Sequence, residues 1–157
     1  MNNIIEYSGL AKELPVNIKA YKQFNINEII EIEHNRAGIK DIIKVVANSY
    51  ITNQRIIKTA EGEALDGEKL TGLKYLVKGS MDLKIYYEED NQIGLLGVKS
   101  ASVKFYNGIV LGKEFMSSNN LILNIYIEDI YSEIISDRKF LVAITVTAIV
   151  EGDSEYE

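Results

Sequence analysis

The feature that most constrains the fold is an alternation of apolar and polar side chains over 17 consecutive residues. Between Thr71 and Tyr87 the odd positions are mainly large and apolar, whereas most even positions are lysine, glycine or another small or polar residue. Because a β-strand places successive side chains on opposite faces, a period of two predicts one long strand with one buried face. The residues expected to point into the core are Leu73, Val77, Met81, Leu83 and Ile85.

A polar turn and a second strand pattern follow. Residues 88–92 carry acidic or amide side chains that predict a turn, and residues 93–106 predict an antiparallel return strand. Gly94 and Gly97 lie inside this return strand, where isolated glycines indicate a bulge. The middle of the chain is therefore expected to form a long β-hairpin.

Strand patterns also dominate the rest of the chain. Residues 41–58 are rich in β-branched side chains, and residues 121–127 and 134–150 alternate between apolar and polar positions. Helix signals are confined to residues 27–32, whose first residue is a candidate N-cap, and to residues 128–135. The last strand is expected to complete the core with Phe140, Val142, Ile144 and Val146.

Long strands with so little helix must bury their apolar faces against another sheet. We therefore expect an all-β fold, an antiparallel β-sandwich or a flattened barrel with long hairpins and at most one or two short helices. Residues 1–24 show no regular period and are expected to form an N-terminal arm, and residues 25–150 the β domain. Residues 151–157 are expected to form an acidic C-terminal tail.

Composition argues against several classes of function. The chain carries 17 Lys and Arg against 23 Asp and Glu, and this net charge of −6 disfavours a general nucleic-acid binder, which needs a basic surface. With no cysteine and one histidine, thiolate chemistry is excluded, and zinc sites and histidine catalysis are disfavoured. No apolar run approaches the ~18–20 residues that span a bilayer, and the first residues lack the pattern of a signal peptide. We expect no enzymatic activity, no cofactor, no nucleic-acid partner and no membrane span.

One acidic loop is a candidate for binding calcium. Four carboxylates within eight residues, beside Gly62 and Gly67, offer the oxygen ligands and tight turns that suit this ion. Their spacing differs from the alternating ligands of an EF-hand loop, so a solvated loop is the preferred interpretation and no metal site is expected. The calcium candidates are Glu61, Glu63, Asp66 and Glu68.

His34 and the tyrosines each allow two interpretations. Acidic neighbours of His34 would suit a pH switch, although a solvated loop histidine is the simpler interpretation. Tyrosines on predicted strands can serve the core or an interface, because the ring is apolar and the hydroxyl is polar. Packing within the domain is the default interpretation for Tyr75, Tyr86, Tyr87, Tyr106 and Tyr126.

The order and spacing of three segments resemble a known family. The segments are NINEIIEIE, LTGLKYLVKGSMDLKIYYEED and LILNIYIEDIYSEIISDRKFLVAITVTAIV, and they extend over about residues 25 to 150. They resemble the SPOCS domain, the spore coat domain of clostridia and related spore-formers. This resemblance implies a structural or morphogenetic protein of the spore surface, and the family supplies no catalytic residue.

The leading hypothesis is a non-enzymatic, self-assembling protein of the bacterial spore surface. It would be a coat or exosporium lattice component or the fibre subunit of a spore appendage, made in the mother-cell cytoplasm and deposited on the spore. Its partners would be copies of itself and other coat or exosporium proteins. The alternative is a non-polymerising binding module that recruits a coat morphogenetic protein, and an acidic-loop hydrolase is disfavoured.

Subunits are expected to join through strand edges and the N-terminal arm. A sheet edge presents unpaired N–H and C=O groups, to which an extended segment of a neighbouring subunit can add as a strand. The arm is too apolar for an idle tail, whereas the acidic tail is expected to stay solvated. The candidate assembly residues are Ile4, Ile5, Tyr7, Leu10, Leu14, Val16 and Ile18.

Overall fold

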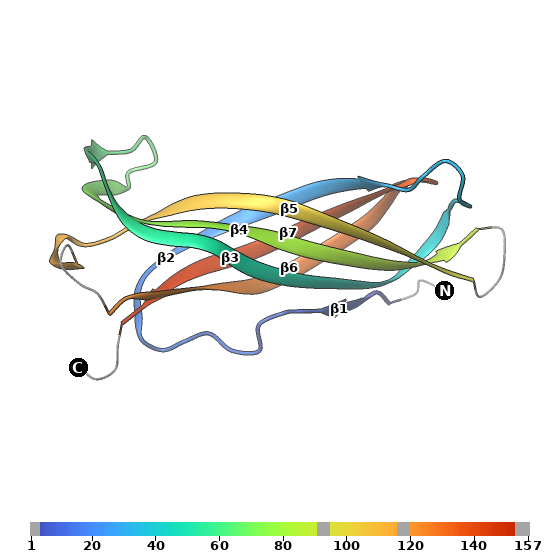
Figure 1. The fold of residues 1–157 in the computed structure, drawn as a ribbon, viewed down its shortest axis with the longest axis horizontal. Coiled ribbons are helices and arrows are strands. Elements are labelled where there is room, and N and C mark those ends of the chain that lie inside the picture. The colour runs from blue at the N-terminus through green and yellow to red at the C-terminus, as the bar shows by residue number, and fades with distance from the viewer. Residues whose placement is uncertain (1–3, 91–94, 116–119, 153–157) are drawn as a thin grey trace.

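A computed structural model describes residues 4–90, 95–115 and 120–152, and these residues form seven strands and one short 3₁₀ turn (Figure 1). The all-β fold expected from the sequence is confirmed. The elements are β1 (Glu6–Ser8), β2 (Ile18–Glu31), β3 (Ile39–Glu63), β4 (Lys69–Glu89), β5 (Leu96–Val110), η1 (Lys113–Phe115), β6 (Ile122–Ser136) and β7 (Lys139–Glu151).

The strands make two sheets that stack as a sandwich. Sheet A has the order β1-β3-β4-β5 and sheet B the order β2-β7-β6. Neighbouring strands run antiparallel, except that β1 pairs parallel with β3. At the two sides of the sandwich β3 lies beside β6 and β5 lies beside β2, and within the described residues the sheets do not close into a barrel.

The core lies between the sheets and contains the residues that the alternation predicted. All nine expected core side chains are buried, and Lys78, on the opposite face of β4, is exposed. Tyr87 of β4 and Phe140 of β7 meet across the two sheets with ring centroids 5.3 Å apart. Each such large apolar side chain contributes about 1.5–3 kcal/mol by leaving water.

Neither expected helix exists. Residues 27–32 continue β2 up to Glu31, and Asn27 pairs with Ala143 in the ladder to β7 rather than capping a helix. Ile26 and Ile30 point into the core on the same face of this strand. Their spacing of four residues fits a strand as well as a helix, so the apolar pattern alone did not distinguish the two.

Residues 128–135 form the second half of β6, and the expected turn there is wrong. The register shifts between Ile127 and Asp129, so Ile127 and Ile130 both face the core although they are three residues apart. A bulge therefore produced a helix-like spacing. The alternation over residues 134–150 is also not one strand, because a turn at Asp137 and Arg138 divides it between β6 and β7.

The return strand β5 is regular, and the predicted bulge at Gly97 is wrong. Pairing between β4 and β5 runs from Leu96 to Val110 without a register shift, whereas Gly94 lies outside the described residues. A Cβ at Gly97 would lie 2.2 Å from the Tyr87 ring on the neighbouring strand. Glycine stands here because the ring lies across it.

The β3–β4 hairpin extends past the rest of sheet A. β5 pairs with β4 only as far as Lys74, while β3 and β4 remain paired out to Glu63 and Lys69. The tip is the projection at the upper left of Figure 1. Four register shifts in β3 bend and twist this long strand.

Candidate functional site

The two sides of the sandwich present different strand edges. Within the described residues β2, β5 and β6 each pair with one other strand, and β3 pairs on its outer side only with the three residues of β1. We call the side formed by β3 and β6 the β3–β6 edge, and the side formed by β2 and β5 the β2–β5 edge. These edges are where a further strand could add.

At the β3–β6 edge the inward-facing side chains of β6 are largely apolar. Leu123, Ile127 and Ile130 are buried, and Ser132 is the buried polar residue among them. On β3 the buried residues include Ile42, Val45 and Ala47. Such an edge invites association unless something covers it.

The chain's own N-terminal segment, residues 4–17, covers this edge. Glu6 to Ser8 pair with Lys44 to Val46 of β3, and the Ala11 N–H donates to the Ile127 carbonyl of β6 at 2.8 Å. The segment thus passes from sheet A to sheet B along the bottom of Figure 1.

Tyr7 joins the two sheets at this point. Its hydroxyl lies 3.0 Å from the Ser132 Oγ and accepts the Ser132 N–H at 3.1 Å, so the phenol supplies the buried serine with polar partners. Gly9 follows with φ 110°, and a Cβ there would lie 2.0 Å from the Ala47 carbonyl oxygen. Glycine is therefore required for the segment to leave β3 and cross to β6.

The expected assembly residues divide into two groups on this segment. Ile5 and Tyr7 are partly buried and pack against the core. The others are exposed, with Ile4 at 95% and Val16 at 101% of their full accessible surface. The exposed group is Ile4, Leu10, Leu14, Val16 and Ile18.

The expected boundary of the N-terminal arm at residue 24 does not coincide with a structural boundary. Ile18 to Phe24 belong to β2 and pair with β7 from Glu151 to Val146. Of the expected arm, only residues before Ile18 therefore lie outside β2, and three of these, Glu6–Ser8, pair with β3 as β1. Of the acidic tail, Glu151 closes β7 and residues 153–157 lie outside the described residues.

The β2–β5 edge differs because charged side chains lie on its inward-facing side. Lys22 and Glu28 are half-buried on the core side of β2, between exposed neighbours. Lys99 of β5 has the same inward direction and bonds to Glu33 in the loop after β2. Inward-pointing charges on an edge strand oppose the addition of another strand, because addition would bury them.

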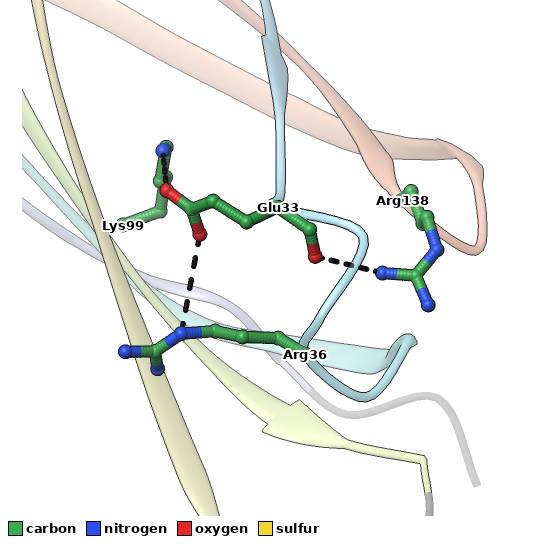
Figure 2. Close-up of polar contacts among 4 residues, drawn as sticks. All are labelled: Glu33, Arg36, Lys99 and Arg138. Carbon is green, nitrogen blue, oxygen red and sulfur yellow. Dashed lines mark hydrogen bonds and ion pairs between the residues drawn. The ribbon is translucent and has the colours of Figure 1, made fainter.

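Glu33 is the centre of a charged cluster at one end of this edge (Figure 2). The carboxylate lies 2.6 Å from the Lys99 Nζ and 3.9 Å from the Arg36 Nε. The backbone carbonyl of Glu33 accepts a hydrogen bond from the Arg138 guanidinium at 2.9 Å. The hydrogen bond from Lys99 holds the pKa of Glu33 below its ordinary value. A carboxylate kept ionised in this way is a poor general acid, and the cluster ties three chain segments together.

The calcium candidates are not brought together. Glu61 forms an ion pair with Lys113 at 3.0 Å, and the Asp66 carboxylate accepts the Glu68 N–H at 3.1 Å in the hairpin turn. Among the described residues no group of three or more His, Asp or Glu side chains is arranged to hold a metal ion. His34 is 84% exposed and lies 3.6 Å from Glu31.

The tyrosines on strands are divided between core and surface. Tyr75 and Tyr87 are buried, and burial raises the pKa of both phenols. Tyr126 is half-buried and donates to Glu151 at 3.1 Å, and its pKa is raised by burial and by this carboxylate. Tyr86 is half-buried and Tyr106 is 62% exposed, both on the outer face of sheet A.

That outer face is hollowed, which the sequence patterns did not predict. Two adjoining depressions of about 590 and 630 Å³ share Ser102 and run along β3, β4 and β5. We call them together the trough. Tyr50, Tyr86 and Tyr106 lie along it around a centre of small side chains, where the Ser102 hydroxyl donates to Asp82 at 2.8 Å. The missed signal was the pair of serines at even positions of β5, Ser100 and Ser102, whose small side chains leave a depression in this face.

No protein-family model, curated protein or solved structure matches the chain. Within the part of the chain that the structure describes, no helix is long and apolar enough to span a membrane.

Proposed function

We propose that the protein is a non-enzymatic, self-assembling structural protein of the bacterial spore surface, as a coat or exosporium component or the subunit of a spore appendage. The spore location rests on the resemblance to the SPOCS domain. The β3–β6 edge supports the assembly mechanism: its buried face is apolar, and a short segment of the chain covers it.

The N-terminal segment is suited to exchange between copies. On β3 it is held by three paired residues and by the ion pair of Glu6 with Lys44, and on β6 by the Ala11 bond and Tyr7. Of its apolar side chains, Ile5 and Tyr7 pack against the core. The same bonds are satisfied when the segment of a neighbouring copy takes this place, because exchange of an identical element makes no new type of contact. Linking copies in this way, head to tail, gives an open filament when the rotation between copies does not close.

Residues 12–17, which follow the Ala11 contact, would then connect the copies, and Leu10 lies beside that contact. Leu10, Leu14 and Val16 are exposed in the single chain, at 40%, 43% and 101%. Burying them against a neighbour supplies the apolar contact that a stable assembly needs, at about 25 cal/mol per Å² removed from water.

Removing residues 1–17 tests the proposal. This deletion spares β2, which begins at Ile18. We expect electron microscopy to show regular polymers of the full chain and none of the truncated chain, while circular dichroism shows that the truncated chain stays β-rich. A synthetic peptide of residues 1–17 should block growth of the full-length polymers.

Two outcomes would contradict the proposal. Normal polymers from the truncated chain would exclude the N-terminal segment as the link. A full-length protein that stays monomeric and captures one coat protein would favour the non-polymerising binding module.

A further inference from the structure

The two outer faces of the sandwich carry opposite charge. Outward residues are those that alternate with the buried ones on each strand, and on sheet A part of them line the trough. The trough holds three exposed lysines and one exposed aspartate, a net charge of +2 on a chain whose total charge is −6. These residues are Lys78, Lys84, Lys104 and Asp82.

The outer face of sheet B is acidic. It carries five carboxylates and two lysines along β2, β6 and β7, a net charge of −3. Asp129 and Glu133 are exposed on β6, and Glu128 reaches across β7 to accept the side-chain N–H of Gln23 on β2. The full set is Glu31, Glu128, Asp129, Glu133, Glu151, Lys19 and Lys139.

Both faces also carry exposed aromatic rings. In the trough Tyr50 is 54% and Tyr106 is 62% exposed, and on sheet B Tyr21 is 68% and Tyr131 is 51% exposed. Tyrosine is enriched where proteins meet, because one side chain offers both apolar area and a hydroxyl. Each face therefore combines a charge of one sign with rings able to pack.

We propose that the trough receives the acidic outer face of sheet B of a second copy, so that copies stack face to back. The inference rests on the proposed self-assembly and adds a second contact to it. Two chains of charge −6 repel each other unless the +2 face meets the −3 face, so charge selects this one orientation. Because each copy has both faces, the contact repeats in an open column.

Paired charge reversals test the stacking on the full chain. Variant one carries Lys84→Glu and Lys104→Glu in the trough, and variant two carries Asp129→Lys and Glu133→Lys on sheet B. Matched controls reverse the same charges on the projecting hairpin, with Lys58→Glu and Lys69→Glu or with Glu63→Lys and Glu68→Lys. Sedimentation velocity at low and high salt measures the association of each, alone and mixed.

Wild type should associate most strongly at low salt, because screening shortens the reach of charge to about 3 Å at 1 M. Each trough or sheet B variant alone should need an about tenfold or higher concentration to associate, whereas the controls should differ from wild type by less than about threefold. Mixing the two variants should restore association, because the reversed trough of one then meets the reversed face of the other.

Other results overturn the stacking. Unchanged association of the single variants, or a mixture that stays dissociated, removes the face-to-back contact while leaving exchange of the N-terminal segment intact. A wild type that stays monomeric at every salt concentration removes both proposals. Binding of polygalacturonate, an acidic polysaccharide, that the trough variant loses while its self-association is unchanged would make the trough a glycan site instead.

Discussion

The β3–β6 and β2–β5 edges meet the same physical problem in different ways. Both expose unpaired backbone groups beside an apolar core, and both must avoid uncontrolled pairing with other chains. The β2–β5 edge carries its protection in its own strands, as Lys22, Glu28 and Lys99. The β3–β6 edge depends on a separate segment that is held by a few bonds. In the proposed assembly, the guarded edge would stay closed and exchange of the segment at the covered edge would give growth one direction.

The inward side chains of the two edges should differ most in their effect on stability. Ile127→Ala, on β6, should lower the free energy of unfolding by about 2–5 kcal/mol, because it empties a buried site beside the N-terminal segment. Glu28→Ala, on β2, should change it by about 0.5 kcal/mol or less, because this residue is only half-buried. Urea unfolding of both variants checks the contrast, and similar losses would mean that the edges are equivalent.

Gly9→Ala should detach the cover. The new Cβ meets the Ala47 carbonyl in a backbone conformation that side chains rarely adopt, at a cost of about 1–3 kcal/mol for the conformation alone. Gly67→Ala is the matched control, because Gly67 has φ 90° and an added Cβ there would lie within 4 Å of no residue other than its chain neighbours. Proteolysis should cleave the N-terminal segment faster in the first variant, and equal rates in the two would show that the close approach to β3 is unimportant.

Tyr7→Phe should loosen the cover without removing it. Loss of the Tyr7 hydroxyl leaves the buried Ser132 without this hydrogen-bond partner, which lowers the free energy of unfolding by about 1 kcal/mol. Hydrogen exchange should accelerate at the Ser132 amide and at the amides of β1, and stay unchanged in β2. Acceleration throughout the protein would indicate that Tyr7 supports the whole fold rather than one edge.

The smallest effect is expected at the charged end of the β2–β5 edge. Because its pKa is lowered in the folded state, Glu33 stabilises the protein above its ordinary pKa near 4.5, and this stabilisation is lost as pH falls through the lower folded value. Glu33→Gln should therefore lower the melting temperature slightly at pH 7 and not at all at pH 2. The Glu33 side chain is solvated, so the expected change is small. An equal or larger difference in melting temperature at pH 2, where the carboxyl is protonated, would assign the effect to another group.

Alternation was enough to predict an all-β fold, a sandwich or a flattened barrel, and its centre, because β4 and β7 have sheet neighbours on both sides and bury one face without interruption. It failed where register changes, because the bulge after Ile127 gave β6 a three-residue spacing. The glycine signal failed separately, because Gly97 lies in a regular strand and marks a ring lying across it. Long-range partners were also invisible in the sequence, since the contact of Tyr7 with Ser132 and the outline of the trough depend on how distant segments pack.

The pairing of β2 with β7 has a consequence for how the chain acquires its fold. Ile18 pairs with Glu151, and Tyr7 bonds to Ser132. A ribosome adds about 5–20 residues per second. Seconds therefore pass between synthesis of the N-terminal segment and completion of β3 and β6, the strands that it contacts. Contacts of such long sequence separation also form slowly once the chain is free. In the proposed assembly, the N-terminal segment of one newly made chain can pair with the open β3–β6 edge of another during that interval, in competition with closure within each chain. Local protein concentration at the site of synthesis would then decide between monomer and polymer.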